Sequence, residues 1–90
     1  MSEFSIAETK GFEKVKTSID KKLYIKITNI VYPQLRQNPY FGTNIKKLKG
    51  ELEGYYRYRL GDYRLFYVID DGKVVVVVVD FRHRQNAYKY

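Results

Sequence analysis

A run of six valines, Val74 to Val79, restricts the fold of this chain more than any other feature. A strand built from it is apolar on both faces and therefore belongs in the interior of a sheet. The pair Asp71-Gly72 just before it predicts a two-residue hairpin turn. The run is far shorter than the about 20 residues that cross a membrane. We expect a soluble protein with a buried strand over Lys73 to Phe81.

Other strands and turns can be placed around this one. Tyr55 to Leu60 and Tyr63 to Asp70 are rich in aromatic and β-branched residues, as strands are. The pair Gly61-Asp62 between them suits a two-residue turn with glycine first. Glu3 to Ala7 alternates as a short first strand, and residues 38–54 form a loop-like connection.

Two helices are expected between the first strand and this connection. The first runs from about Glu8 to Ile19, with apolar residues on one face and lysines over much of the rest. Asp20 is a good N-cap for the second helix. Pro33 predicts a kink or an early end, and the helix stops before Asn38-Pro39 in any case.

The order of elements defines an α+β fold class. Two N-terminal helices pack on a twisted, mostly antiparallel four-stranded sheet, followed by a short C-terminal tail or helix. We expect a single domain over residues 1–90.

Composition excludes several kinds of site. The chain has no cysteine and one histidine, His83, so neither a disulfide nor the usual Cys/His zinc site can form. The carboxylates show no metal-ligand spacing, and no cofactor is expected. The N-terminus lacks the pattern of a signal peptide. We expect a cytoplasmic protein with no membrane partner.

The net charge of +7 and the isoelectric point near 9.6 indicate a polyanionic partner or simply a solvated basic surface. The cations gather in the second half of the chain.

If Gly61-Asp62 forms a two-residue turn, Arg59 lies opposite Arg64, and Arg57 and Phe66 share their face. Opposed arginines destabilise a sheet unless an anion lies between them or their side chains splay into solvent. Arginines beside aromatic rings suit a phosphodiester backbone with bases to stack.

Several motifs along the chain resemble the RelE/ParE superfamily of bacterial and archaeal toxins. They are Leu48-Lys49-Gly50, Gly54-Tyr55-Tyr56-Arg57, Gly61-Asp62-Tyr63-Arg64-Leu65-Phe66-Tyr67, and His83-Arg84 with Tyr88. The resemblance implies an antitoxin partner that wraps and neutralises the toxin. For RelE-type members it also implies cleavage of mRNA, commonly in the ribosomal A site. The nucleotide's own 2′-hydroxyl attacks the adjacent phosphate, without a metal.

The resemblance also assigns roles to residues. Arg64 contacts the scissile phosphate, Arg82 protonates or stabilises the leaving group, and Tyr88 stacks on the base. Arg57 and Arg59 stand where RelE carries two lysines, one of them the proposed base, and arginine is a poor base. His83 is the first candidate for proton transfer, with Lys46 or Lys49 as the fallback. The cations assigned to RNA binding are Lys46, Lys49, Arg57, Arg59 and Arg84.

Strict alternation from the Asp71-Gly72 turn puts Val75, Val77, Val79 and Phe81 on the face of Arg64, and Arg82 on the other. We therefore expect the strand to end or bulge near Asp80 to Arg82, so that Arg82 can join the site.

Two alternative functions remain open. One is a ParE-like inhibitor of DNA gyrase without nuclease activity, and the other is an inactive paralogue that only binds the antitoxin. The C-terminal set of Arg82, His83, Arg84 and Tyr88 favours the nuclease, because ParE-like members tend to lack it.

Overall fold

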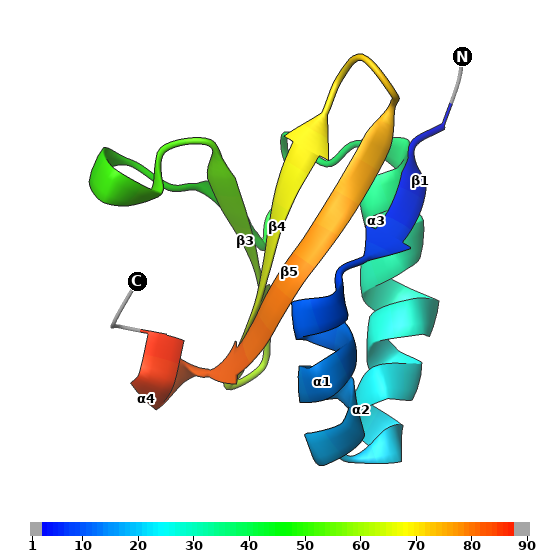
Figure 1. The fold of residues 1–90 in the computed structure, drawn as a ribbon, viewed down its shortest axis with the longest axis vertical. Coiled ribbons are helices and arrows are strands. Elements are labelled where there is room, and N and C mark those ends of the chain that lie inside the picture. Colours follow the sequence, from blue (N-terminus) through cyan, green and yellow to red (C-terminus); the bar gives the residue numbers. More distant parts are fainter. Residues whose placement is uncertain (1–2, 88–90) are drawn as a thin grey trace.

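The structure, a computed structural model, describes residues 3–87 (Figure 1). Its sheet has the strand order β1-β5-β4-β3-β2, in which β1 pairs with β5 in parallel and all other pairs are antiparallel. The strands are β1 (Ser5–Glu8), β2 (Ile45–Lys47), β3 (Tyr55–Leu60), β4 (Tyr63–Asp70) and β5 (Val75–His83). The helical elements are α1 (Lys10–Ser18), α2 (Lys21–Lys26), the π-helical turn η1 (Ile27–Val31), α3 (Tyr32–Gln37), the 3₁₀ turn η2 (Gly50–Leu52) and α4 (Arg84–Ala87). No helix within this range is long and apolar enough to span a membrane.

The α+β class is confirmed, but the sheet has five strands rather than four, and the helical layer consists of α1, α2 and α3 rather than two helices. The additional strand, β2, lies in the connection expected to be a loop, where Lys46 pairs with Arg57. Three residues are too few to show a period of two, so the pattern could not reveal this strand. The valine-rich strand β5 lies in the sheet interior, between β1 and β4, as expected.

The helices begin and end largely where their capping residues predict. Thr9 accepts a hydrogen bond from the Phe12 amide and caps α1, while Asp20 caps α2 through the Lys22 amide. The second helical segment continues past Pro33 to Gln37, so the early end was wrong. Pro33 lies in the first turn of α3, and the turn before it is π-helical. This arrangement accommodates a residue that has no amide hydrogen to donate.

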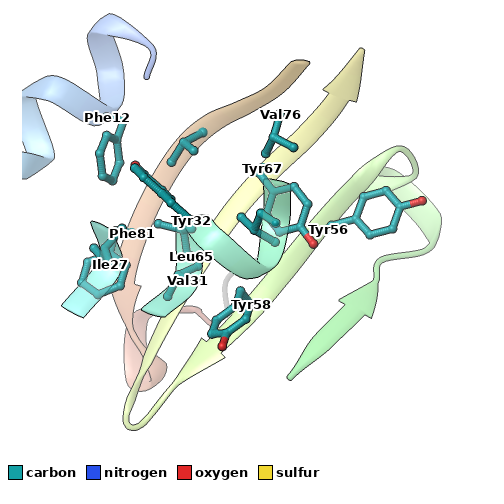
Figure 2. Close-up of a cluster of buried hydrophobic side chains, with 12 residues drawn as sticks. Phe12, Ile27, Val31, Tyr32, Tyr56, Tyr58, Leu65, Tyr67, Val76 and Phe81 are labelled. Atoms are coloured by element: carbon teal, nitrogen blue, oxygen red, sulfur yellow. The ribbon is translucent and has the colours of Figure 1, made fainter. Parts of the chain in front are cut away.

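The helices α1 to α3 cover one face of the sheet, whereas α4 lies at the end of β5 on the opposite side (Figure 1). The core fills the space between the sheet and the three helices (Figure 2). Phe12, Leu35 and Tyr67 are fully buried there. The Tyr67 hydroxyl donates to the Pro39 carbonyl at 2.7 Å and the Tyr58 hydroxyl to the Gln34 side chain at 2.9 Å. Tyrosine can therefore occupy this core without leaving its hydroxyl unpaired.

Glu8, at the end of β1, joins this strand to all the covering helices. Its carboxylate accepts hydrogen bonds from Tyr32 at 2.7 Å, Tyr24 at 2.9 Å and Lys16 at 3.0 Å. Burial alone would raise the pKa of Glu8, but the three hydrogen bonds outweigh burial and lower this pKa below its ordinary value of 4.5. The ionised carboxylate therefore stabilises the folded state.

We expect Glu8→Ala to lower the free energy of unfolding by at least about 2 kcal/mol, since it removes several hydrogen bonds to a charged group. Because the pKa of Glu8 is lowered in the folded state, its stabilisation is present above pH 4.5 and is lost as the pH falls through the lowered pKa. Urea unfolding of wild type and Glu8→Gln at several pH values measures this loss. The stability difference between them should shrink below pH 4.5. The exposed Glu3→Gln is the control, and a difference that does not change with pH would contradict the assignment.

The turn between β4 and β5 differs from the expected two-residue hairpin. Asp70 pairs with Val75, so the loop has four residues, 71–74. Val74 therefore lies in the turn, with φ at 56°, rather than in the strand. A β-branched residue is disfavoured at positive φ. The Val74 carbonyl accepts a hydrogen bond from the Ser5 amide at 3.0 Å, which joins the turn to the start of β1.

We expect Val74→Gly to raise stability by about 1 kcal/mol, because glycine adopts positive φ without the steric cost that valine meets. The matched control is Val75→Gly, one residue later, where the backbone is a regular strand and glycine should destabilise. Thermal unfolding of both variants measures the two effects. Destabilisation of similar size in both would show that Val74 is not strained.

Candidate nucleic-acid interface

The sheet gathers cations on the face that α1 to α3 do not cover. Arg59 pairs with Arg64, and Arg64 pairs in turn with Arg82, so three arginines stand in one row across β3, β4 and β5. Directly paired residues point to the same side of a sheet. In the next row, Lys46 pairs with Arg57. We call the surface formed by Lys46, Arg57, Arg59, Arg64 and Arg82 the arginine face.

The register of β3 and β4 is the predicted one. Leu60 pairs with Tyr63, so Gly61-Asp62 is a two-residue turn, and Gly61 has a φ of 58°. Phe66, also on the arginine face, is buried although it lies outside the helix-covered core. On the opposite side of the hairpin, the side chains of Tyr56, Tyr58, Leu65 and Tyr67 are buried beneath the helices.

A bulge in β5 brings Arg82 onto the arginine face. Tyr67 pairs with Val78 and Phe66 with Asp80, which leaves Val79 without a partner on β4. The expected bulge is thus present, but one residue before the predicted segment. As a consequence Phe81 pairs with Leu65 in the core and does not lie on the arginine face, where strict alternation would put it.

Two of the three arginines in the row are held by the protein itself. The Arg64 guanidinium donates to the carbonyls of Gly61 at 3.0 Å and Tyr63 at 2.9 Å. The Arg82 Nε donates to the Asp80 carboxylate at 2.7 Å. These contacts reduce the cost of placing arginines side by side and orient both guanidinium groups.

Asp80 is the residue of this site that the sequence analysis missed. Its side chain is only 14% exposed, and its second oxygen accepts a hydrogen bond from the Phe81 amide at 2.8 Å. Asp80 and Arg82 share a face because they are two residues apart on one strand, and the bulge before them turns that face toward Arg64. Their spacing of two residues was the available signal.

His83 lies on the other side of the sheet from the arginine face. It pairs with Tyr63, and the two rings meet edge to face with centroids 5.3 Å apart. Both residues line a cavity of about 480 Å³ between the end of β5 and the turn that joins α1 and α2. The register thus turns His83 away from Arg64, although Asp80 and Arg82 also line this cavity.

The other residues predicted for the site lie outside the arginine face. Arg84 begins α4, is exposed, and places its Nε 4.0 Å from the Asp62 carboxylate. Lys49 is exposed directly before η2. Tyr88 lies outside the described residues. Within the described part of the chain, no three His, Asp or Glu side chains are grouped so that they could hold a metal ion.

Comparisons with known proteins agree with this fold. The family model of the ParE toxin of type II toxin–antitoxin systems, parDE, matches residues 7–88. Toxin RelE of Mycobacterium tuberculosis is 33% identical over 72 residues, which are 79% of this chain and 71% of the relative. The toxin–antitoxin complex RelBE2 of M. tuberculosis contains a chain with a TM-score of 0.81 and 26% identity, covering 91% of this chain and 99% of that one. The RelE–RelB complex of Pyrococcus horikoshii gives 0.74 and 25%, covering 93% and 97%.

The fold is thus that of small toxins of the RelE/ParE class. The chain belongs to the ParE toxin family of type II toxin–antitoxin systems.

Proposed function

We propose that this toxin is a metal-independent endoribonuclease that cleaves mRNA on the ribosome and so inhibits translation. The observation that supports this proposal is the row of Arg59, Arg64 and Arg82 on one face of the sheet. Neighbouring strands are about 4.8 Å apart, so the row extends over about 10 Å. Guanidinium groups spaced in this way can contact one phosphate from several sides.

The proposed reaction breaks the bond between phosphorus and the 5′-oxygen of the next nucleotide. The 2′-hydroxyl attacks the phosphorus, a 2′,3′-cyclic phosphate forms, and the 5′-oxygen leaves with a proton. Negative charge develops on the phosphate oxygens during the attack, and preorganised cations stabilise it. Arg64, anchored on the turn carbonyls, is suited to this role. Arg82, oriented by Asp80, is suited to stabilise the leaving oxygen.

The register of the sheet argues against His83 as the group that accepts the 2′-hydroxyl proton. Lys46 lies on the arginine face opposite Arg57, whereas His83 lies behind the sheet beside Tyr63. A general base must come within hydrogen-bond reach of the proton that it removes. We therefore assign Lys46, Arg57 and Arg59 to binding of the RNA backbone.

We also propose that a cognate antitoxin neutralises this toxin through an acidic segment. The related chains in M. tuberculosis and P. horikoshii are parts of complexes with RelB-type partners, and this chain carries a net charge of +7. Complementary charge accelerates association and aligns two proteins. Titration of the toxin with the product of the adjacent gene should give nanomolar affinity that weakens with salt. Absence of such a partner would contradict this proposal.

The second candidate function is inhibition of DNA gyrase, which is favoured by the match to the ParE family model. One experiment separates the two functions. Purified toxin is incubated with mRNA, with and without ribosomes, and the new 3′ ends are mapped and tested for cyclic phosphate. A parallel reaction measures gyrase supercoiling. Cyclic-phosphate ends with unaffected supercoiling support the nuclease, and the reverse result supports the gyrase inhibitor.

A further inference from the structure

A second feature of the arginine face is a cavity of about 280 Å³ at its β2–β3 edge. The turn before β2 forms one side, and two arginines of β3 form the other. The Asn44 carbonyl accepts a hydrogen bond from the Arg59 amide at 2.8 Å, which ties the turn to β3. The residues that line the cavity are Thr43, Asn44, Ile45, Lys46, Arg57 and Arg59.

The cations of this cavity, unlike Arg64 and Arg82, are not held by hydrogen bonds or ion pairs within residues 3–87. Within residues 3–87, no ion pair or hydrogen bond engages the side chains of Lys46, Arg57 or Arg59, and the lining contains no acidic residue. Three positively charged side chains around a small cavity create a strongly positive potential in it. Such a hollow favours an anionic group, and a phosphate fits the chemistry of lysine and arginine.

Asn44 adds a group that can distinguish bases. Its side chain is half-buried, and no other residue of the described range occupies its amide with a hydrogen bond. An amide offers both donors and an acceptor, and Asn can pair with two atoms on one base edge. Thr43 lines the same cavity and adds a hydroxyl.

The distance across the sheet separates this cavity from the position of the scissile phosphate. Lys46 on β2 and Arg82 on β5 are three strand spacings apart, which is about 14 Å. A phosphate bound at Arg64 and Arg82 therefore lies to one side of this cavity. An RNA strand that crosses the β-strands would place successive nucleotides along this direction.

We propose that the cavity is a nucleotide subsite beside the cleavage position. Lys46 and Arg57 hold the phosphate next to the scissile one, and Asn44 with Thr43 recognises the base of that nucleotide. The ligand class is a single-stranded RNA nucleotide. This inference rests on the proposed ribonuclease function.

The first test measures base preference. Wild type, Asn44→Ala and the control Asn29→Ala, an exposed asparagine on the helical side, are incubated with RNA of randomised sequence, with and without ribosomes, and all cut sites are sequenced. We expect wild type and Asn29→Ala to share a base preference at one fixed position beside the cut. Asn44→Ala should reduce that preference about tenfold, the scale of one bidentate base contact. An unchanged preference in Asn44→Ala, or no preference in wild type, would overturn the base-recognition role.

The second test measures binding without cleavage. RNA with a single 2′-deoxynucleotide at the cleavage position is titrated with wild type, Lys46→Ala and the control Lys73→Ala, whose lysine lies in the β4–β5 turn. Loss of one phosphate contact should reduce the slope of log affinity against log salt by about 0.7 for Lys46→Ala only. An unchanged slope would overturn the phosphate contact. If wild type binds this RNA but never cleaves natural RNA, the ribonuclease proposal fails. The salt dependence of binding still shows whether Lys46 contacts a phosphate.

Discussion

Alanine at Arg64 or Arg82 should lower the rate of RNA cleavage about 10²–10³-fold and abolish growth inhibition. Loss of one preorganised group that stabilises developing charge has this size in other enzymes, equivalent to about 2.7–4 kcal/mol. Both guanidinium groups are already oriented, Arg64 by two backbone carbonyls and Arg82 by Asp80. Neither side chain belongs to the core, so the variants should stay folded.

The measurement combines single-turnover cleavage with thermal unfolding of the same samples. Arg36→Ala, an arginine on α3 away from the arginine face, is the matched control and should cleave like wild type. Variants of Arg64 and Arg82 that remain folded and fully active would refute the placement of the site. Variants that lose activity only in proportion to unfolded protein would show a structural role instead.

A single 2′-deoxy substitution at the nucleotide before the scissile phosphate should abolish cleavage, whereas EDTA should leave the rate of cleavage of ribosome-free RNA unchanged. In the proposed reaction the nucleophile belongs to the RNA itself, so its removal leaves nothing to attack the phosphorus. The arginine row supplies the positive charge that a metal ion supplies in other nucleases. The expected effect of the deoxy substitution is larger than that of any protein variant, because no step can replace the missing hydroxyl.

The control RNA carries the 2′-deoxy substitution three nucleotides away and should be cut normally. Denaturing gels that resolve products with cyclic phosphate from those with free hydroxyl ends provide the measurement. Cleavage of the deoxy substrate would indicate attack by water. Loss of activity in EDTA with recovery in magnesium would likewise contradict the proposed chemistry.

Much of the site could be predicted because the β3–β4 hairpin, which carries Arg57, Arg59 and Arg64, depends on local geometry. Gly61-Asp62 specifies a two-residue turn, and this turn alone sets Arg59 opposite Arg64 and turns the tyrosines of β3 toward the helices. The start of α2 at its N-cap Asp20 and the end of α3 before Asn38 also depend on neighbouring residues in the sequence.

Other features depend on partners distant in the sequence. The strand β2 is too short to show alternation and exists because β3 offers it an edge. In the four-residue turn, Val74 adopts positive φ, which the usual preference of Asp-Gly for a two-residue loop does not predict.

The sequence by itself determined the α+β class, the family motifs, the interior position of the valine strand and the shared face of Arg57, Arg59 and Arg64. The tertiary structure alone decided where β5 bulges and therefore which of Arg82 and His83 joins that face. The physical reason lies in the valine run, where every residue has the same side chain and no position marks the extra residue. The pairing of Phe81 with Leu65 in the core selects the register, and that choice turns Arg82 toward Arg64 and His83 toward Tyr63.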